Sequence, residues 1–469
     1  MTAREPVEPA TESAGDRPRP VGFAGRTGWI LFDWASQPFF TLVQTFLFAP
    51  YFVNVLVGDP VHGQALWGYA AAAAGLIVAL TSPALGAIAD ASGRRKPYVA
   101  VCSVGLVVGC ALLWLAEPGP DLNLTLIFAA VVLATVAVEF ATVFTNAMMP
   151  SLVPDHQLGR LSGTGWAVGY IGGLVSLVIV AGLLVADAAS GRTLLGLEPL
   201  LALDAARHEG ERLVGPFSAL WYVVFVLPLF LFTPDRNGLL VSAAPVRDGL
   251  RRLVETLKNV RQYSVVVRFL IARMLYVDGL GAIFAFGGLY GASLFAWGPM
   301  QLGLFGIVLA LAGSVGALAG GWLDDRFGAK SVIMVTLAFL SAGAIGVVSV
   351  DRESVFFVLD VAAPAEGRAT FASAGEQVYL FFAVVIGIMA GPLQSASRSL
   401  LARLAPREMV TEFFGLYAFS GKITAFAAPF LVASVTAASG NQRAGIAVIL
   451  VFLLGGLALM WTVREPDGK

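Results

Sequence analysis

Long apolar runs separated by short polar segments repeat along almost the whole chain. A helix that crosses a bilayer needs roughly 20 such residues, and about twelve runs reach that length: 27–57, 64–89, 97–116, 123–149, 161–187, 216–233, 264–296, 301–323, 331–350, 376–402, 411–438 and 443–463. A membrane β-barrel would show short alternating strands instead. The pattern therefore predicts an all-α membrane protein.

The composition supports this prediction. Of the 469 residues, 57% are hydrophobic and 13% are charged, whereas soluble domains carry about 25% charged residues. The 52 glycines suit close helix packing in a membrane. Cys102 and Cys110 share one apolar run and are expected to be buried thiols, with neither a disulfide framework nor a metal site. The net charge of −1 and the absence of a basic patch give no sign of nucleic-acid binding.

The distribution of Lys and Arg predicts the orientation. If the N-terminus is cytoplasmic, the segments on its side carry roughly 21 Lys and Arg residues. The opposite segments carry about six, namely Arg192, Arg207, Arg212, Arg352, Arg368 and Arg443. Positive charge accumulates on the cytoplasmic side, so both termini are expected there. The Ala- and Arg-rich composition is typical of a high-GC bacterium, which suggests a bacterial inner membrane.

The chain divides into two halves with polar segments around them. We expect a disordered tail at 1–26, six-helix halves at 27–233 and 263–463, a linker at 234–262, and a short tail at 464–469. The linker carries apolar and basic residues at helical spacing, which predicts an amphipathic helix on the inner membrane surface. It can tether the halves or regulate them. The loops 188–215 and 351–375 form either small outer lids or disordered segments.

A motif of the form G-x-x-x-D-x-x-G followed by positive charge occurs twice, half a chain apart. Such duplication is usual in secondary transporters. An Asp that ends one helix can pair with a cation that begins the next, and the pair can hold the helices in one state and release them in another. The candidate latch residues are Gly86, Asp90, Gly93, Arg94 and Arg95 in the first copy, and Gly321, Asp325, Gly328 and Lys330 in the second.

Five ionisable residues fall inside predicted membrane helices: Asp33, Glu139, Arg273, Asp278 and Lys422. Charge within the membrane is costly, so each is a candidate for binding a substrate or coupling ion. Buried structural ion pairs are the competing interpretation. Arg273 and Asp278 are five residues apart, a poor spacing for a pair on one helix, so each is expected to meet another helix. Arg398, near an inner helix end, is interpreted as a structural residue that extends to the interface.

The chemistry of these residues suits a zwitterion. Lys422 or Arg273 can hold a carboxylate, and an acidic side chain can hold an ammonium group. A sugar would instead need aromatic rings, which Trp166, Tyr170, Tyr276, Tyr379 and Tyr417 can supply. No G-x-x-x-x-G-K-[ST] loop is present to bind ATP. No nucleophile–base constellation suggests an enzyme, and no cofactor is expected. A non-transporting membrane sensor is the alternative from another class.

Several strings carry a closer resemblance. The repeated motif resembles the loop signature of the major facilitator superfamily, between helices 2 and 3 and between helices 8 and 9. The strings FDWAS, NAMMP, GTGWAVGYIGG, QSASRSL and EFFGLYAFSGK begin at residues 32, 146, 163, 394 and 412. They are similar to those of the family typified by the fungal autophagy-related vacuolar amino-acid effluxer. In that family the first string usually reads D-W-A-N-S, whereas Ser36-Gln37 stands here.

The resemblance implies a 12-helix major facilitator fold with two pseudo-symmetric halves. It also implies, for the fungal relatives, export of neutral amino acids such as leucine. We expect a monomeric exporter of a small polar solute, most readily an amino acid, coupled to protons or sodium. A sugar:cation symporter is the alternative within the fold. In this fold helices 1, 4, 7 and 11 line the cavity, so Glu139, Asp278 and Lys422 are expected to face one water-filled space. Lys422 would hold an anion, and Glu139 or Asp278 would exchange a proton.

Overall fold

The computed structural model describes residues 21–120, 122–185, 191–193, 195–235, 243–258, 260–297, 299–362 and 370–464. Among them are 12 helices long and apolar enough to cross a membrane, at Phe23–Leu56, His62–Ser92, Lys96–Leu115, Leu124–Ser151, Asp155–Leu184, Glu209–Phe232, Arg261–Phe295, Gln301–Phe327, Ala329–Val348, Ala374–Leu404, Val410–Ser439 and Gln442–Trp461. The predicted all-α membrane fold is confirmed, and we number these helices as spans 1 to 12.

Helical segments account for every span. The first six contain α1 (Phe23–Pro38), α2 (Phe48–Tyr51), α3 (Pro60–Ser92), α4 (Lys96–Leu112), α5 (Leu124–Met148), α6 (Leu158–Ile179) and α7 (Glu209–Phe232). The linker contains α8 (Ala243–Lys258). The last six contain α9 (Ser264–Phe295), α10 (Pro299–Phe327), α11 (Ala329–Val348), α12 (Ala374–Leu404), α13 (Val410–Lys422), α14 (Ala427–Ser439), α15 (Gln442–Ala447) and α16 (Ile449–Trp461).

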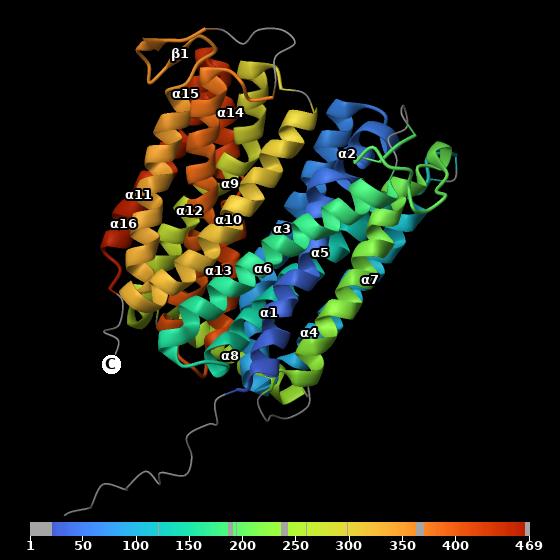
Figure 1. Ribbon diagram of the computed structural model, residues 1–469. Coiled ribbons are helices and arrows are strands. Elements are labelled where there is room, and N and C mark those ends of the chain that lie inside the picture. The colour runs from blue at the N-terminus through green and yellow to red at the C-terminus, as the bar shows by residue number, and fades with distance from the viewer. Residues whose placement is uncertain are drawn as a thin grey trace, which may run out of the picture.

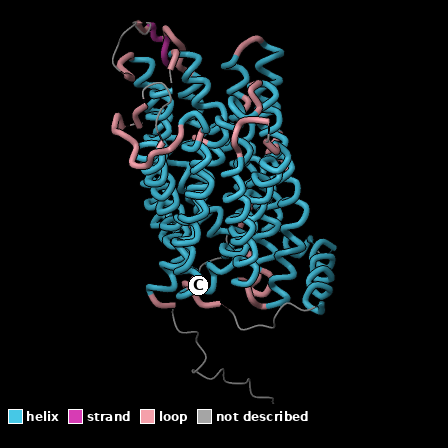
Figure 2. Tube along the Cα trace, turned by 90° about the vertical axis from the view of Figure 1, so that its right-hand side faces the viewer, coloured by secondary structure: helices cyan, strands magenta, loops and turns pink. Residues whose placement is uncertain are grey.

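The helices form two bundles that lie side by side (Figure 1). One apolar cluster of buried residues lies entirely within the N-terminal half, from Phe32 to Leu229. A second lies mainly in the C-terminal half, from Val266 to Val463. Figure 2 shows both bundles as nearly parallel helices. In Figure 1, α1 begins and α16 ends at the lower end of the molecule, which we call the terminal face.

Two spans are irregular in the middle. Span 1 changes after Pro38 from α-helix to a π-helix at Phe39–Phe46, since a proline without an N–H disturbs the helical ladder. Span 11 is interrupted by a turn at residues 423–426, between α13 and α14. Pro429 lies in the first turn of α14 and cannot donate to the carbonyl of Ala425, so the helix restarts beyond the turn.

The linker forms the predicted helix, α8, which packs against α3. Gly249 makes this contact close, because a Cβ there would lie 2.7 Å from the Ile88 Cα. Helix α1 begins at Phe23, so the last residues of the predicted tail 1–26 are helical. Residues 1–20 of that tail, linker residues 236–242 and 259, and residues 465–469 of the C-terminal tail lie outside the described residues. Cys102 and Cys110 are free thiols, the first half-buried and the second buried.

The described parts of the two predicted outer loops contain short elements of secondary structure. Strands β1 (Ser354–Val355) and β2 (Leu359–Asp360) form a short antiparallel hairpin that contacts α12. In the other loop a short helical turn at Ala205–Arg207 precedes α7. Residues 186–190, 194 and 363–369 of these two loops lie outside the described residues. The described parts therefore have defined structure, whereas a lid function remains a prediction.

An ion cluster fastens the loop before α7 to the loop before α5. Arg207 donates two hydrogen bonds to Glu117, at 2.8 and 2.9 Å, and the Arg212 guanidinium lies 3.0 Å from the same carboxylate. The hydrogen bond from Arg207 and the charges of Arg207 and Arg212 lower the pKa of Glu117. Because the pKa of Glu117 is lower in the folded state than in the unfolded state, the cluster stabilises the folded loop at any pH above the unfolded pKa. This stabilisation is lost as the pH falls through the folded pKa.

We therefore expect Glu117→Gln, which mimics the protonated side chain, to loosen residues 204–212. Hydrogen-exchange mass spectrometry at neutral pH should show faster exchange there, and wild type should approach the variant in acid after correction for intrinsic rates. Glu198→Gln, in an exposed part of the same loop, is the matched control. Identical protection in Glu117→Gln and wild type would show that the cluster does not hold the loop.

Candidate substrate cavity

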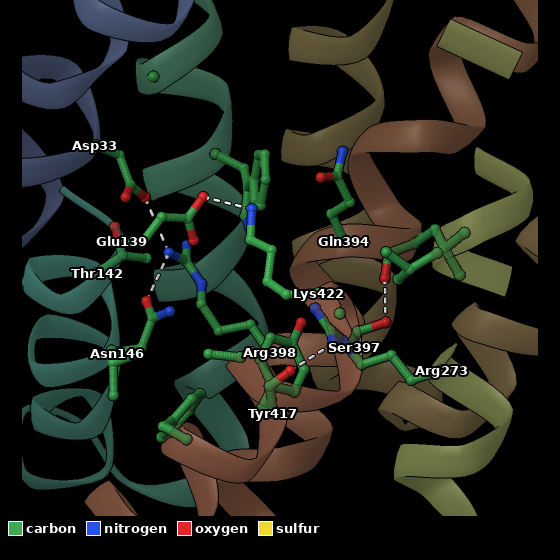
Figure 3. A pocket seen from close by; sticks show the side chains of 18 of the residues that line it. Asp33, Glu139, Thr142, Asn146, Arg273, Gln394, Ser397, Arg398, Tyr417 and Lys422 are labelled. Atoms are coloured by element: carbon green, nitrogen blue, oxygen red, sulfur yellow. Dashed lines mark hydrogen bonds and ion pairs between the residues drawn. The ribbon is translucent and has the colours of Figure 1, made fainter. Parts of the chain in front are cut away.

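A cavity of about 380 Å³ lies between the two halves. It is lined by residues of spans 1, 4, 5, 7, 10 and 11. Six of the predicted site residues are in its wall: Asp33, Glu139, Trp166, Arg273, Tyr417 and Lys422. Figure 3 shows how five of these side chains, all but that of Trp166, converge from both bundles. Charged residues scattered over nearly 400 positions of the sequence thus share one space.

The first ion pair across the cavity joins Lys422 to Glu139. The Lys422 Nζ lies 2.6 Å from the Glu139 Oε1 (Figure 3). Glu139 projects from the apolar helix α5, and Lys422 is the last residue of α13. The positive charge of Lys422 offsets the negative charge of Glu139, which reduces the free-energy cost of placing both groups within the membrane. Because the two residues belong to different halves, the pair also joins the bundles.

The second ion pair joins Arg398 of α12 to Asp33 of α1, with 3.0 Å between Nη1 and Oδ2. Arg398 also donates to the Asn146 side chain at 3.2 Å, to the Ser162 hydroxyl at 2.8 Å and to the Ser162 carbonyl at 2.6 Å. Its guanidinium carbon is 4.9 Å from the centre of the Trp29 ring. These contacts fasten α12 to three spans of the other half.

The sequence interpretation of Arg398 as a residue extending to the interface is wrong. Its side chain is 4% exposed and lines the cavity. The signal that could have identified it is the polar string before it, because Gln394 and Ser397 line the same wall. Ser397 and Arg398 follow Gln394 by three and four residues, and helical spacing therefore places both on the same face of α12 as Gln394.

Arg273 is held differently from the other two cations. Its Nη1 donates to the Tyr417 carbonyl at 2.7 Å and to the Ser420 hydroxyl at 2.9 Å. Its guanidinium lies on the Tyr417 ring, 3.3 Å from the centroid. Gly421 leaves room for it, since a Cβ there would be 2.9 Å from Nη1. Among the described residues, no carboxylate lies within ion-pair distance of Arg273.

Asp278 does not line this cavity, so the expectation that it shares a water-filled space with Glu139 and Lys422 is wrong. Its neighbours Tyr276, Val277 and Leu280 form the wall, whereas Asp278 itself is 4% exposed. Each residue turns about 100° around an α-helix, so Asp278 points away from the face that carries Val277 and Leu280. It lies close enough to span 11 for the Thr424 hydroxyl to act on its carboxyl.

Of the aromatic candidates, some line the cavity and others do not. Trp166 lines the cavity, and Tyr276 lines it while its hydroxyl is 2.7 Å from that of Ser397. Tyr170 hydrogen-bonds Gln394 at 2.9 Å. Tyr379 lies elsewhere, in an aromatic cluster with Trp297 and other rings of the C-terminal half.

The wall as a whole combines charge with apolar surface. Among the described lining residues there are three cations and two carboxylates, which leaves an excess of one positive charge with all groups ionised. Its apolar residues include Phe40, Val143, Val277, Leu280, Leu393 and Phe414. Charge acts strongly in such a space because the surrounding dielectric is low. The cavity therefore suits a small molecule with a carboxylate and an apolar part.

The first copy of the latch motif joins α3 to α13 across the two halves. Asp90 forms an ion pair with Arg95 at 3.3 Å. The same carboxylate accepts from the Thr411 hydroxyl at 2.6 Å and from the Glu412 N–H at 2.8 Å. It thereby caps the N-terminus of α13, where the helix dipole favours negative charge. Gly93 takes a backbone φ of 74°, which favours glycine.

The second copy makes the equivalent contact between α10 and α6. Asp325 accepts from the Gly159 N–H at 2.8 Å and from the Arg160 N–H at 3.1 Å, and so caps the N-terminus of α6. Asp324 beside it forms an ion pair with Arg403 at 2.5 Å and a hydrogen bond with Ser399. Lys330 donates to the Trp461 carbonyl at 3.2 Å. Both motif carboxylates thus cap a helix of the opposite half.

Close backbone contacts accompany these caps. A Cβ on Gly86 would meet the Thr411 carbonyl oxygen, and one on Gly321 would lie 2.6 Å from the Gly159 carbonyl oxygen. The two ion pairs between the halves lie at the cavity, and the caps lie between it and the terminal face. The cavity is therefore closed toward the terminal face.

The match to known families agrees with this architecture. The model of the family described as vacuole effluxer Atg22 like matches residues 50–469. The chain belongs to the Atg22-like family. It is also similar to the uncharacterized MFS-type transporter YxiO of Bacillus subtilis (strain 168), with 24% identity over 94% of this chain and 95% of that protein.

Fungal relatives match over a shorter stretch. Autophagy-related protein 22 of Cryptococcus neoformans var. neoformans is 26% identical over 66% of this Atg22-like chain and 53% of its own length. The chain therefore spans about half the length of these curated relatives.

Solved structures show the same fold. The human organic anion transporter MFSD10 has a TM-score of 0.67 at 13% identity, covering 93% of this chain and 99% of MFSD10. The major facilitator superfamily transporter FucP in its outward conformation has a TM-score of 0.66 at 14% identity, covering 94% and 99%. The predicted major facilitator fold is thereby confirmed for this Atg22-like chain.

Proposed function

We propose that this Atg22-like protein, an MFS-type membrane transporter, moves an amino acid or a similar zwitterion by alternating access and exports it with a proton gradient. The observation that carries the proposal is the cavity, where two ion pairs cross between the halves and Arg273 has no carboxylate partner within 4 Å among the described residues. We place the protein in a bacterial inner membrane as a monomer, with both termini cytoplasmic and no enzymatic activity.

The charge arrangement supports a zwitterionic substrate. A carboxylate can bind at Arg273, or at Lys422 by displacing Glu139. The displaced Glu139, or Asp33, can then receive the ammonium group. The apolar wall can receive a side chain such as that of leucine, because burying apolar surface favours binding. A sugar would offer no counter-charge to the three cations of the wall.

Counterflow in proteoliposomes tests this proposal. Vesicles loaded with unlabelled L-leucine should take up radiolabelled L-leucine faster than empty vesicles, and D-xylose should not compete. Competition by xylose instead of by amino acids would favour the sugar:cation symporter. Binding of leucine without any exchange would favour the non-transporting sensor. The Arg273→Gln variant should exchange leucine much more slowly, whereas Arg251→Gln on α8 should behave as wild type.

The helix caps at the terminal face support alternating access. Asp90 and Asp325 make their contacts across the halves, so opening this face must break them. An interaction present in only one state shifts the equilibrium toward that state by its differential free energy. The caps and ion pairs therefore favour the state in which the cavity is closed toward the terminal face.

We expect Asp90→Asn and Asp325→Asn each to weaken this closed state. A charged cap on a helix dipole contributes up to about 2 kcal/mol in partly buried geometry, so each change should shift the equilibrium by roughly 5- to 30-fold. Spin-label distances across the terminal face would show a larger open population, and turnover should fall more than leucine affinity. Asp59→Asn, in an exposed outer loop, is the control. Turnover and distances equal to wild type would show that these loops are ordinary turns.

A further inference from the structure

A cluster of buried polar atoms lies between α9 and span 11, behind the cavity wall. Asp278 Oδ1, Thr424 Oγ1 and Arg273 Nε are all buried without a hydrogen-bond partner. Buried polar atoms in proteins nearly always have partners, and an unpaired carboxylate is the most costly of them. Three such atoms therefore gather around one helix interruption, and a proton on Asp278 would satisfy the carboxylate among them.

The interruption of span 11 is next to the carboxyl. Thr424 lies in the turn at 423–426, and no backbone hydrogen bond of the described chain uses the N–H of Thr424 or Phe426. Helix α14 starts just beyond, at Ala427. A helix N-terminus favours negative charge, so an ionised Asp278 attracts the start of α14 more strongly than a neutral one. The charge of the Asp278 carboxyl therefore affects the position of α14 relative to α13.

Of the charged groups on the helices around Asp278, Arg273 is the one that acts on its carboxyl. Helix α9 packs against α10, α12, α13, α14 and α16. Helix α16 contributes Phe452 and Leu453 beside Gly279, and α14 carries no charged residue. Lys422 of α13 is paired with Glu139, and Arg398 of α12 is paired with Asp33. The Asp278 carboxyl interacts with the positive charge of Arg273 of α9 and with the side-chain hydroxyl of Thr424.

The nature of the ligand follows from these surroundings. A metal cation would need a shell of oxygen ligands and would be repelled by the guanidinium of Arg273. No group of three or more His, Cys, Asp or Glu residues that could hold a metal occurs in the described part of the chain. A proton needs no ligand shell, and it removes the cost of an unpaired buried charge.

We propose that Asp278 binds the coupling proton, at a site separate from the substrate cavity, and that its protonation changes the geometry of span 11 at Thr424. Because Asp278 does not line the cavity, the proton reaches it through a transient opening at the Thr424 turn: hydronium from one side gives its proton to Oδ1, so that an O–H bond forms and water is left. On the other side that bond breaks and the proton returns to water. Span 11 also carries Tyr417 and Lys422, so this change reaches the substrate site. The inference rests on the proposed transport function. It assigns the proton to Asp278 instead of Glu139, because the negative charge of Glu139 is already balanced by the Lys422 ammonium group 2.6 Å away.

The first test needs no substrate. Infrared difference spectra of the purified full-length protein between acidic and alkaline buffer should show the carbonyl band of a protonated carboxyl group. We expect the band to be lost in Asp278→Asn, shifted in Asp278→Glu, and retained in Glu139→Gln. A band that survives in Asp278→Asn and disappears in Glu139→Gln would overturn the assignment. Equal melting temperatures of Asp278→Glu and wild type would show that the site is folded.

The second test uses proteoliposomes and L-leucine. Asp278→Asn should keep leucine counterflow within about twofold of wild type while losing accumulation driven by a proton gradient, and Asp278→Glu should regain part of it. Proton-driven accumulation in Asp278→Asn, or wild-type accumulation that requires sodium instead of protons, would overturn the proposal. If wild type shows no leucine exchange, the proposed substrate is wrong, while the infrared result still decides whether Asp278 takes the proton.

Discussion

Lys422→Ala is expected to lower the affinity for L-leucine by about 10- to 100-fold. A hydrogen bond to a charged group contributes about 1.5–3 kcal/mol, and every 1.4 kcal/mol is a tenfold change in affinity. The change also leaves Glu139 without its partner at 2.6 Å. The pair is partly buried, with 32% of the Lys422 side chain exposed, so its loss should cost less than the about 3–5 kcal/mol of a fully buried pair, and the melting temperature should fall modestly. Isothermal titration and thermal unfolding would measure the two effects.

A double variant separates binding from stability. Lys422→Ala with Glu139→Gln removes the unpaired carboxylate, so it should recover most of the lost melting temperature without recovering binding. Lys258→Ala, on the exposed side of α8, is the control for loss of a lysine. Normal leucine binding in Lys422→Ala would mean that the pair only joins the halves, and that Arg273 or Arg398 holds the carboxylate.

Gly163→Ala is expected to open the terminal face. Gly163 of α6 faces α10 so closely that a Cβ would lie 2.8 Å from the Gly321 Cα and would overlap the Ala317 carbonyl oxygen. These neighbours are backbone atoms, which cannot turn aside as a flexible side chain would. Overpacking of this kind costs about 1–3 kcal/mol, and here the cost applies only while the halves are closed. The open state should therefore gain roughly 5- to 150-fold in population.

Hydrogen-exchange mass spectrometry can detect this shift as faster exchange at residues 155–165 and 317–327. Gly281→Ala is the matched control, because it lies in α9 and an added methyl group there would have nothing within 4 Å. Alanine is intrinsically more favourable than glycine in a helix by about 1 kcal/mol, so a gain of exchange in Gly163→Ala cannot come from weaker helix formation. Unchanged exchange in that variant would show that the close approach of α6 and α10 is not needed for closure.

The sequence was sufficient for the membrane architecture. The twelve predicted runs agree with the observed spans to within a few residues at most ends, because the thickness of the bilayer sets how long an apolar helix must be. The repeated Asp and Gly motif was visible for a similar reason. It combines residues that are close along the chain, and each copy follows a complete apolar run.

The pairing of charges could be found only in the tertiary structure. Lys422 meets Glu139 across 283 positions, and Arg398 meets Asp33 across 365. In one sequence no local signal joins such residues, because their contact depends on how the two bundles pack and rotate. The same packing brings Arg398 into the cavity, turns Asp278 behind its wall, and directs Asp90 and Asp325 to helix ends of the opposite half. Hydropathy determines which segments enter the membrane, whereas the facing of each helix is decided by the neighbours against which it packs.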